Sequence, residues 1–169
     1  MSRAAERGRP SDSVSKRGLK AEADEVGKVD VSYLEGTIGY AIRRAQMAVF
    51  DDIYRAFEGL SITTAQFSVL AVVADNPGLS QADLASALGV ERPRMVPIID
   101  NLETRKLAVR VTNPKDGRAR LIELTPEGRK LLSELKARFA RHQTRMIARL
   151  DSNKEEFLAS LWRLAGAKA

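Results

Sequence analysis

The sequence predicts a mostly α-helical protein with a minor β part, and three patterns lead to this fold class. Apolar residues recur at helical spacing over most of the 169 residues. Between residues 107 and 124 the spacing changes to an alternation of apolar and polar side chains, which is typical of strands. Residues with capping and turn chemistry separate these segments. We therefore expect six helices and one two-stranded hairpin.

Composition and charge narrow the possible classes of function. Hydrophobic residues make up 44 % and charged residues 30 %, with a net charge of +6 at pH 7, which suits a soluble protein with a polyanionic partner. The chain has no cysteine and one histidine, His142, so disulfides, thiol catalysis and multi-histidine metal sites are excluded. Glycine-rich phosphate-binding motifs are also absent. We expect no enzyme, no cofactor and no metal.

The N-terminal region and the apolar runs bear on location. Residues 1–20 are polar and lack the apolar stretch of a secretory signal, and no run approaches the roughly 18 apolar residues that span a membrane. A cytoplasmic location is therefore expected. Residues 1–30 are rich in Ser, Gly, Arg, Lys and Glu, which predicts a disordered basic tail. This tail is either a solvated segment or an arm that touches DNA.

The first predicted helix covers residues 32–57 within a dimerisation segment at residues 31–60. It carries two apolar stripes, one at helical spacing and one that repeats every seven residues. A helix that is apolar on two sides must be covered on two sides, which a partner subunit would achieve. The first stripe consists of Leu34, Ile38, Ala41, Ile42, Ala45, Val49 and Ile53, and the second of Tyr33, Tyr40, Met47 and Tyr54.

The second and third helices are marked by capping residues. Thr63 and Gln66 have the spacing of a capping box at the start of the second helix, which residues 76–78 end. Ser80 is a favourable N-cap for a short third helix, with Asp83 at its third position. Gly89 ends that helix and permits the tight turn of a helix-turn-helix.

A fourth helix and the hairpin complete a segment at residues 61–125. The fourth helix is expected from about Arg92 to Lys106, with Ile98, Ile99 and Leu102 on its buried face. The two alternating runs cover residues 107–112 and 118–124, and the Pro- and Gly-containing turn between them predicts a β-hairpin with a basic tip.

Two further helices are expected in residues 126–169. The fifth begins at Thr125-Pro126-Glu127, where Thr is the N-cap and Pro the first helical residue. The sixth is expected to begin at Ser152, with Glu155 completing a capping box. Both have strongly apolar faces, which predicts a second dimerisation segment. The apolar residues are Leu131, Leu132, Leu135, Phe139, His142, Met146 and Leu150 on the fifth helix, and Phe157, Leu158, Leu161, Trp162 and Leu164 on the sixth.

The order of elements and the placement of charge indicate DNA binding. A helix-turn-helix followed directly by a short hairpin is the winged arrangement, whose second helix enters the major groove of double-stranded DNA. Basic residues are in surplus between residues 89 and 120, mainly at the start of the fourth helix and on the hairpin. The predicted DNA-binding residues are Ser80, Gln81, Arg92, Arg94, Met95, Lys115, Arg118 and Arg120.

Three stretches carry a family resemblance, at residues 63–70, 79–92 and 101–128. The most specific is the Asp-x-Arg of residues 116–118, which leads into Leu124-Thr125 and Gly128. The chain resembles the MarR family of bacterial regulators over about residues 33–164. The resemblance implies a homodimer, a pseudo-palindromic operator, and a wing in which Arg118 contacts DNA while Asp116 braces it. The sequence departs from the family pattern at Pro93-Arg94 and Pro97.

The resemblance also implies repression that is released by a small molecule bound between the dimerisation helices and the DNA-binding lobe. The candidate lining residues are Tyr40, Arg44, Met47, Phe50, Phe67 and His142, although most of them would also suit an ordinary core. Arg138, Arg141 and Arg145 share one face of the fifth helix. That face is either solvated or a site for an anionic aromatic effector, such as an aromatic acid or its coenzyme A thioester.

Three other functions stay open at this point. A protein that bends or coats DNA without an effector would have little sequence preference. An enzyme would need an acid and a nucleophile that converge on His142. In a protein-interaction module the charges of the hairpin would be incidental.

Overall fold

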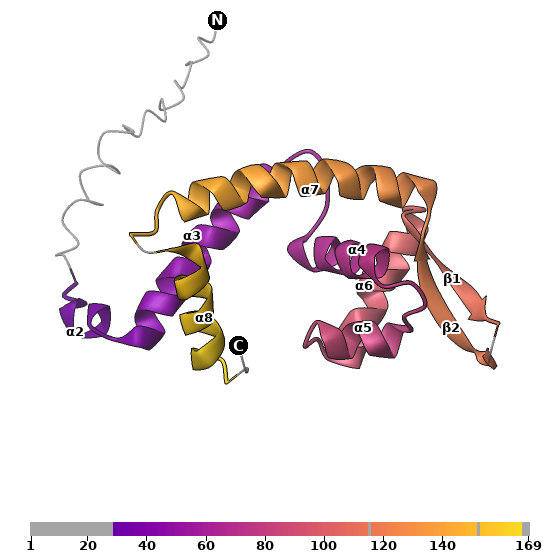
Figure 1. The fold of residues 1–169 in the computed structure, drawn as a ribbon, viewed down its shortest axis with the longest axis horizontal. Helices are drawn as coiled ribbons and strands as arrows, with labels where there is room; N and C mark the ends of the chain where they lie inside the picture. Colours follow the sequence, from indigo (N-terminus) through magenta and orange to yellow (C-terminus); the bar gives the residue numbers. More distant parts are fainter. Residues whose placement is uncertain (1–28, 115, 152, 167–169) are drawn as a thin grey trace, which may run out of the picture. The chain divides into compact units, whose positions relative to one another are not determined.

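A computed structural model describes residues 29–114, 116–151 and 153–166 of the chain. These residues form seven helices and one two-stranded sheet (Figure 1). The described residues up to Arg44 belong to one compact unit and those from Ala45 onward to a second, and the boundary falls within helix α3. None of the described helices is both long and apolar enough to cross a membrane. The predicted basic tail lies almost entirely outside the described residues.

The first unit contains helix α2 (Ser32–Glu35) and the start of helix α3 (Ile38–Ala56). The prediction of one continuous helix over residues 32–57 is wrong, because the chain breaks at Gly36 and Thr37. The Thr37 hydroxyl donates to the Leu34 carbonyl (2.7 Å) and accepts from the Tyr40 backbone N–H (3.4 Å). A threonine side chain that bonds to the backbone in this way competes with the helical ladder and begins a new helix.

The helix-turn-helix part of the second unit begins with two helices that start as predicted. Helix α4 (Thr64–Asp75) has a complete capping box between Thr63 and Gln66. Helix α5 (Gln81–Ala87) has another between Ser80 and Asp83. In each box two backbone N–H groups that lack helical partners are satisfied by side chains.

A tight turn joins α5 to helix α6 (Arg92–Thr104), as the sequence predicts. Gly89 has a φ of +61°, its N–H donates to Ser86, and the next N–H, of Val90, donates back to Ala85 (2.9 Å). This left-handed helix end favours glycine because a Cβ would crowd the backbone. Helix α6 continues through Pro97. Because proline has no backbone N–H, the helical hydrogen bond from residue 97 to the Pro93 carbonyl cannot form.

The hairpin follows α6 directly. Strands β1 (Ala108–Asn113) and β2 (Asp116–Leu124) pair antiparallel, from Ala108 opposite Leu124 to Thr112 opposite Arg120. The Leu79 carbonyl accepts from the Ile122 N–H (2.9 Å), so the segment that leads into α5 also lies against β2. This bond fixes the wing to the base of the helix-turn-helix.

Helix α7 (Pro126–Ile147) begins in a close contact with the end of α6. The Thr125 hydroxyl donates to the Lys106 carbonyl (2.7 Å) and accepts from the Gly128 N–H (3.0 Å). A Cβ at Gly128 would lie 1.9 Å from the Leu107 carbonyl oxygen, so only glycine fits there. The Leu-Thr-x-x-Gly pattern is therefore the contact that joins α7 to the wing.

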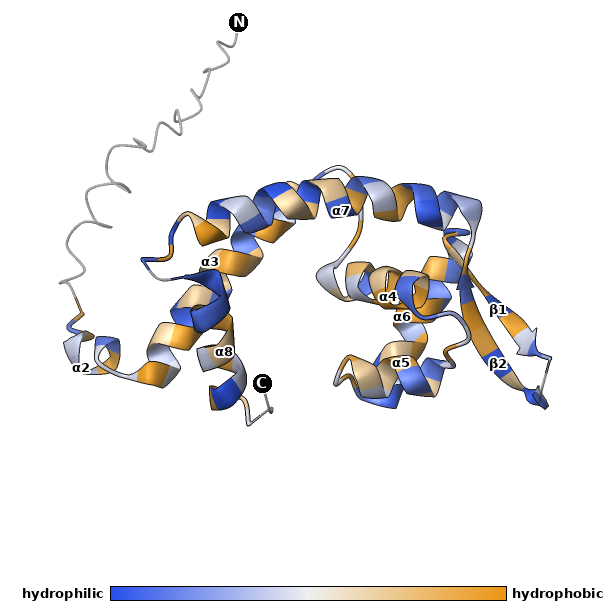
Figure 2. Cartoon of the chain, viewed as in Figure 1, coloured by the Kyte–Doolittle hydropathy of each residue, from blue (hydrophilic) through white to orange (hydrophobic). Residues whose placement is uncertain are grey.

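The N-cap of helix α8 (Lys154–Leu164) lies one residue later than predicted. Its N-cap is Asn153, whose side chain accepts from the Glu155 N–H (2.7 Å), and the predicted N-cap, Ser152, lies outside the described residues. Its apolar side chains are exposed, as Trp162 shows at 57 %. The hydropathy colouring in Figure 2 shows apolar positions along α8 and along α3.

The core of the second unit lies among the end of α3, α4, α5, α6, the wing and α7. Its largest fully buried side chains are Leu70, Leu84, Met95, Ile99, Leu102, Ile122, Leu135, His142 and Val69.

Candidate DNA interface and effector cavities

The first turn of α6 presents two exposed arginines. Arg92 and Arg94 are exposed, and Arg94 has one ion pair, at 3.8 Å to Glu91, in which both side chains are about four-fifths exposed. An exposed pair of this kind contributes little stability, so the Arg94 guanidinium can turn toward a base or phosphate at small cost. Both predicted contacts are therefore sterically available.

Met95 is a correction to the predicted DNA-binding residues. Its side chain is fully buried in the core, next to Leu84 and Ile99 in the same cluster. Position 95 lies one residue after Arg94, and one residue turns an α-helix by about 100°, which carries the side chain from the exposed to the buried face. Met95 therefore holds α6 in place and cannot touch DNA.

Ser80 and Gln81, at the start of α5, are half-buried and already bonded. The Ser80 hydroxyl donates to the Asp83 carboxylate (2.7 Å), and the Ser80 backbone N–H donates to the same carboxylate (2.9 Å). These two hydrogen bonds lower the pKa of the Asp83 carboxyl. The Gln81 carbonyl oxygen accepts from the Arg110 guanidinium (3.0 Å). A DNA contact by either residue would have to share these bonds or replace them.

The wing carries exposed arginines, as the sequence predicts. Arg118 is exposed, and its backbone N–H donates to the Asp116 carboxylate (3.0 Å), so Asp116 braces the backbone and leaves the guanidinium free for DNA. Arg120 is also exposed and donates to the hydroxyl of Thr112 on the facing strand. Lys115, the remaining predicted contact on the wing, lies outside the described residues.

Arg110 joins the elements of this interface, and sequence reasoning missed its role. From β1 its guanidinium bonds to Asp100 (2.7 Å) and to Glu103 on α6, in addition to Gln81 on α5. Burial lowers the pKa of Arg110, but the hydrogen bond with Asp100 and the charges of Glu103 and Asp100 outweigh burial and raise it. The available signal was the pair of carboxylates three residues apart on the preceding helix.

The predicted effector residues fall into separate places. Phe50, Phe67 and His142 line a cavity of about 260 Å³ between α3, α4 and α7. Phe139 completes its wall, with ring centroids 5.0 Å from Phe67 and 5.5 Å from His142. We call this space the aromatic cavity. Met47 is not among its lining residues and is about half exposed.

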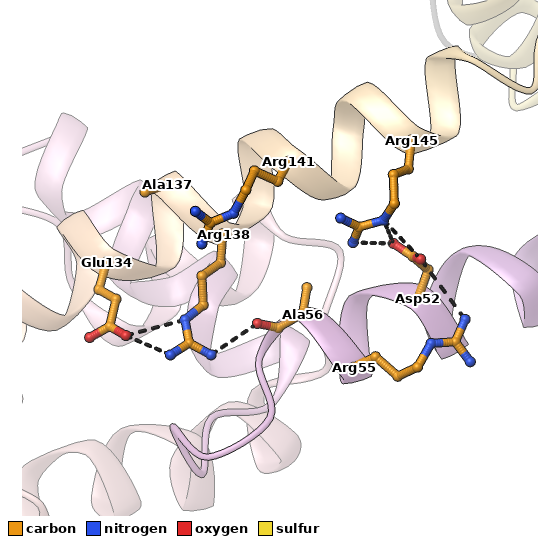
Figure 3. A pocket seen from close by; sticks show the side chains of 8 residues that line it. All are labelled: Asp52, Arg55, Ala56, Glu134, Ala137, Arg138, Arg141 and Arg145. Atoms are coloured by element: carbon orange, nitrogen blue, oxygen red, sulfur yellow. Dashed lines mark hydrogen bonds and ion pairs between the residues drawn. The ribbon is translucent and has the colours of Figure 1, made fainter.

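The arginines of α7 line a different space, which we call the arginine cleft. Arg138, Arg141 and Arg145 face Asp52 and Arg55 of α3 across a cleft of about 500 Å³ (Figure 3). The cleft and the aromatic cavity share no lining residue. The predicted effector residues on α7 are therefore divided between two spaces, with the arginines in the cleft and His142 in the aromatic cavity.

Tyr40 and Arg44, the remaining predicted effector residues, lie one helical turn apart in the first unit. The Arg44 guanidinium lies 5.9 Å from the Tyr40 ring centroid and donates to the phenol oxygen (3.4 Å). This contact is typical of a helix surface pair.

Asp52 occupies the boundary between the two cavities. Its carboxylate is 8 % exposed and accepts from His142 Nδ1 (2.7 Å) and from Arg145 Nη2 (2.7 Å) and Nε (3.1 Å). The bonds from Arg145 and then from His142 hold the pKa of this carboxyl well below its usual range. Asp52 is therefore ionised at neutral pH. Sequence reasoning missed its role because an Asp51-Asp52 pair on a helix is indistinguishable in the sequence from ordinary surface charge.

Comparison with known proteins agrees with this geometry. The family model described as MarR family matches residues 59–119. A protein of Thauera aromatica, with an assigned role in regulating transcription of the hcr operon, is 35 % identical over 152 residues, which cover 88 % of this chain and 90 % of that protein. The chain belongs to the MarR family. It is a MarR-type transcriptional repressor, and not an enzyme.

Solved structures of other MarR-type regulators match the fold. The repressor CouR bound to a 23-mer DNA duplex is 36 % identical, with a TM-score of 0.75, over 82 % of this chain and 99 % of that chain. CouR bound to p-coumaroyl-CoA is 34 % identical, with a TM-score of 0.74, over 84 % and 100 %. BpsR of Bordetella bronchiseptica, whose DNA binding is regulated by 6-hydroxynicotinic acid, is 27 % identical, with a TM-score of 0.68, over 78 % and 92 %.

Proposed function

We propose that this MarR-type repressor acts as a homodimer on a pseudo-palindromic operator and is released by an anionic aromatic effector. The dimer is supported by apolar side chains that stand exposed on α2, α3 and α8, where water is an unfavourable neighbour. The largest exposed fractions are those of Tyr33 (86 %), Ile38 (67 %), Trp162 (57 %) and Leu164 (56 %). On this proposal residues 31–60 and 126–169 form the dimer, and residues 61–125 bind DNA.

The proposed DNA contacts differ in kind. Arg94 and Arg92 at the start of α6 would enter the major groove, where an arginine can bind the two acceptors of guanine at once. Arg118 and Arg120 on the wing would contact the backbone or the minor groove. Ser80 and Gln81 would contact backbone phosphate from the start of α5. This division follows from which element carries each side chain.

The aromatic cavity is the observation that carries the effector proposal. Three phenylalanines and a buried histidine line it, and apolar walls with a few polar groups are typical of small-molecule sites. Its volume of about 260 Å³ suits a single-ring group and is below the roughly 300–1,000 Å³ of sites for drug-sized ligands. The aromatic part of a thioester would fit inside, and its coenzyme part would lie outside.

The similar proteins support both forms of this ligand. CouR has been solved with p-coumaroyl-CoA, and the DNA binding of BpsR is regulated by 6-hydroxynicotinic acid. Both ligands combine an aromatic ring with anionic groups. Release would require that the ligand bind more tightly to a dimer shape that no longer matches the groove.

The test is calorimetry of the full-length protein with 4-hydroxycinnamate and with its coenzyme A thioester, alongside operator binding. We expect at least one of the two to bind and to weaken operator affinity by about 5- to 150-fold, the usual range of such coupling. Phe67→Leu should weaken that binding, because Phe67 lines the aromatic cavity. Phe157→Leu is the control, because Phe157 does not line the aromatic cavity but a neighbouring apolar cavity beside α8.

Two outcomes would contradict the proposal. If neither ligand gives heat with the wild-type protein or shifts operator affinity, the effector is of another class. If the protein also binds random DNA as tightly as any operator, it coats DNA without reading it.

A further inference from the structure

We infer that the arginine cleft is a phosphate-binding site in its own right, separate from the aromatic cavity, and that Asp52 links the two. The site itself stands on the geometry of α3 and α7. The link to the aromatic cavity rests on the function proposed above.

Two of the four guanidiniums in the cleft have no hydrogen-bond partner among the described residues. Among the described residues Arg141 has no polar partner, and the single partner of Arg55 is Asp52, at 3.9 Å. Arg138 and Arg145 are instead engaged, the first with Glu134 and two backbone carbonyls, the second with Asp52. Figure 3 shows the four arginines around the same opening.

The charges in the cleft favour an anion that carries two negative charges. Its lining includes four arginines against Asp52 and Glu134, which leaves a surplus of two positive charges (4 − 2). A guanidinium is planar and binds two oxygens of a phosphate side by side. The volume of about 500 Å³ admits a pyrophosphate or a nucleotide phosphate and is larger than one carboxylate needs.

The cleft and the aromatic cavity open on different sides of the α3–α7 pair. On α7 the cleft is lined by Arg138, Arg141 and Arg145, whereas the cavity is lined by Phe139 and His142. With about 100° of rotation per residue, the mean directions of the two sets differ by roughly 100° around the helix axis. An anion in the cleft is therefore a second occupant, or a distant part of one long ligand.

Asp52 supplies a direct chemical link between the two spaces. One oxygen of its carboxylate accepts both from Arg145, which lines the cleft, and from His142, which lines the aromatic cavity. If a phosphate binds Arg145 and breaks its hydrogen bonds to Asp52, then His142 and Arg55 are the remaining partners of the Asp52 carboxylate. The His142 bond to Asp52 then strengthens, and the wall of the aromatic cavity changes with it.

The test of the site is calorimetry of the full-length protein with inorganic pyrophosphate and, separately, with free coenzyme A. We expect pyrophosphate to bind the wild-type protein, and Arg141→Ala to bind it about 10- to 100-fold more weakly, the effect of losing a charged hydrogen bond. Arg149→Ala removes the same charge from outside the cleft and should bind pyrophosphate like the wild type.

The two probes distinguish the sources of the phosphate. Tighter binding of coenzyme A than of pyrophosphate, with the same loss in Arg141→Ala, assigns the site to the coenzyme part of a ligand. Equal binding assigns it to a simple phosphate. Absence of pyrophosphate binding, or an equal loss in Arg141→Ala and Arg149→Ala, overturns the site. Because no aromatic ligand is used, failure of the effector proposal would not affect this result.

The link between the two spaces is tested by titrating 4-hydroxycinnamate into the protein with and without saturating pyrophosphate. We expect the affinity for 4-hydroxycinnamate to change by about fivefold or more in the wild type, and pyrophosphate affinity to change by the same factor in the reverse experiment. In Asp52→Asn the factor should approach one. If Asp52→Asn does not fold, the two wild-type titrations decide, since a factor of one in both overturns the link.

Discussion

At the scale of single residues, Asp52 is the most constrained charge in the protein. A buried carboxylate is costly unless partners replace its water, and His142 and Arg145 together provide charged hydrogen bonds from both sides. Within the part of the chain that is described, no buried side-chain nitrogen or oxygen lacks a hydrogen-bond partner. The cluster therefore holds α3 against α7 while it keeps a full negative charge inside.

This cluster predicts how stability depends on pH. The pKa of Asp52 in the folded protein lies below its ordinary value of 3.8, so its contribution is complete above about pH 5 and is lost as the pH falls through the folded value. We expect wild type to be more stable than Asp52→Asn at pH 7, and the difference to shrink toward pH 3. Urea unfolding of both proteins at several pH values measures it, and a constant difference would exclude Asp52 as the cause.

Gly128 gives a second prediction at this scale. Because a Cβ there would meet the Leu107 carbonyl oxygen at 1.9 Å, Gly128→Ala must push α7 away from the wing. We expect a loss of at least about 1–3 kcal/mol in the free energy of unfolding, as for other overpacked sites. Gly117→Ala is the matched control, because nothing lies within 4 Å of a Cβ at that position. Equal stability of the two variants in urea would contradict this explanation of the glycine.

At the scale of elements, α6, the recognition helix of the helix-turn-helix, is fixed to the wing by side-chain contacts. Arg110 of β1 bonds to Asp100 and Glu103 of α6, and Thr125 closes the other end of the same junction. Salt bridges between half-buried partners in a network are worth more than isolated exposed pairs. The spacing between Arg94 and Arg118 is therefore held by the fold before DNA is bound.

The two arginines should affect DNA binding in different ways. Arg118→Ala on the wing should weaken binding to all sequences and lower the salt slope by about one unit per lost phosphate contact. Arg94→Ala should cost roughly 1–3 kcal/mol on the operator and relax one base position, if Arg94 binds a guanine. Fluorescence anisotropy on operator and random duplexes, over a range of salt, measures both effects.

A charge-matched control separates these effects from general electrostatics. Arg149→Ala, at an exposed position just past the far end of α7, removes one positive charge away from α6 and the wing. Its operator affinity should stay close to that of the wild type. Unchanged affinity in both Arg94→Ala and Arg118→Ala would mean that these residues do not form the interface.

Sequence reasoning succeeded where the deciding interaction is local. The capping box at Thr63, the N-cap at Ser80 and the alternation of the hairpin depend on residues a few positions apart, and the structure confirms all three. It failed where distant groups decide. Burial of Met95 depends on how α6 packs, and the Asp52–His142 bond joins residues 90 positions apart. The separation of the arginines from the aromatic rings likewise depends on the rotation of α7 against α3.

At the scale of the whole molecule, charge and apolar surface are segregated by element. The exposed arginines considered for DNA lie on α6 and the wing, whereas, apart from Val29, the apolar side chains that are more than half exposed lie on α2, α3 and α8. An apolar cavity of about 380 Å³ also lies beside α8, lined in part by Ile147, Phe157 and Leu158. A second copy that covers these faces would bury them and bring two recognition helices together.

The dimer prediction can be tested at the apolar face of α8. We expect the wild type to sediment as a dimer at micromolar concentration. Replacing Leu161 and Trp162 by aspartate should give a monomer, because each charge would have to be buried in an apolar contact. Ala74→Asp, at an exposed site on α4, is the control and should leave the dimer intact.

The same dimer fixes the geometry of its operator. Two symmetric recognition helices read half-sites about one helical turn, 10–10.5 base pairs, apart. Inserting five base pairs between the half-sites turns one to the opposite face of the duplex, so the dimer should lose most of its affinity. The aspartate variant, as a monomer, should bind the original and the expanded site equally and weakly, because it contacts one half-site at a time. A wild-type protein that tolerates the insertion, or that footprints a single asymmetric site, would show that the two DNA-binding lobes do not act together.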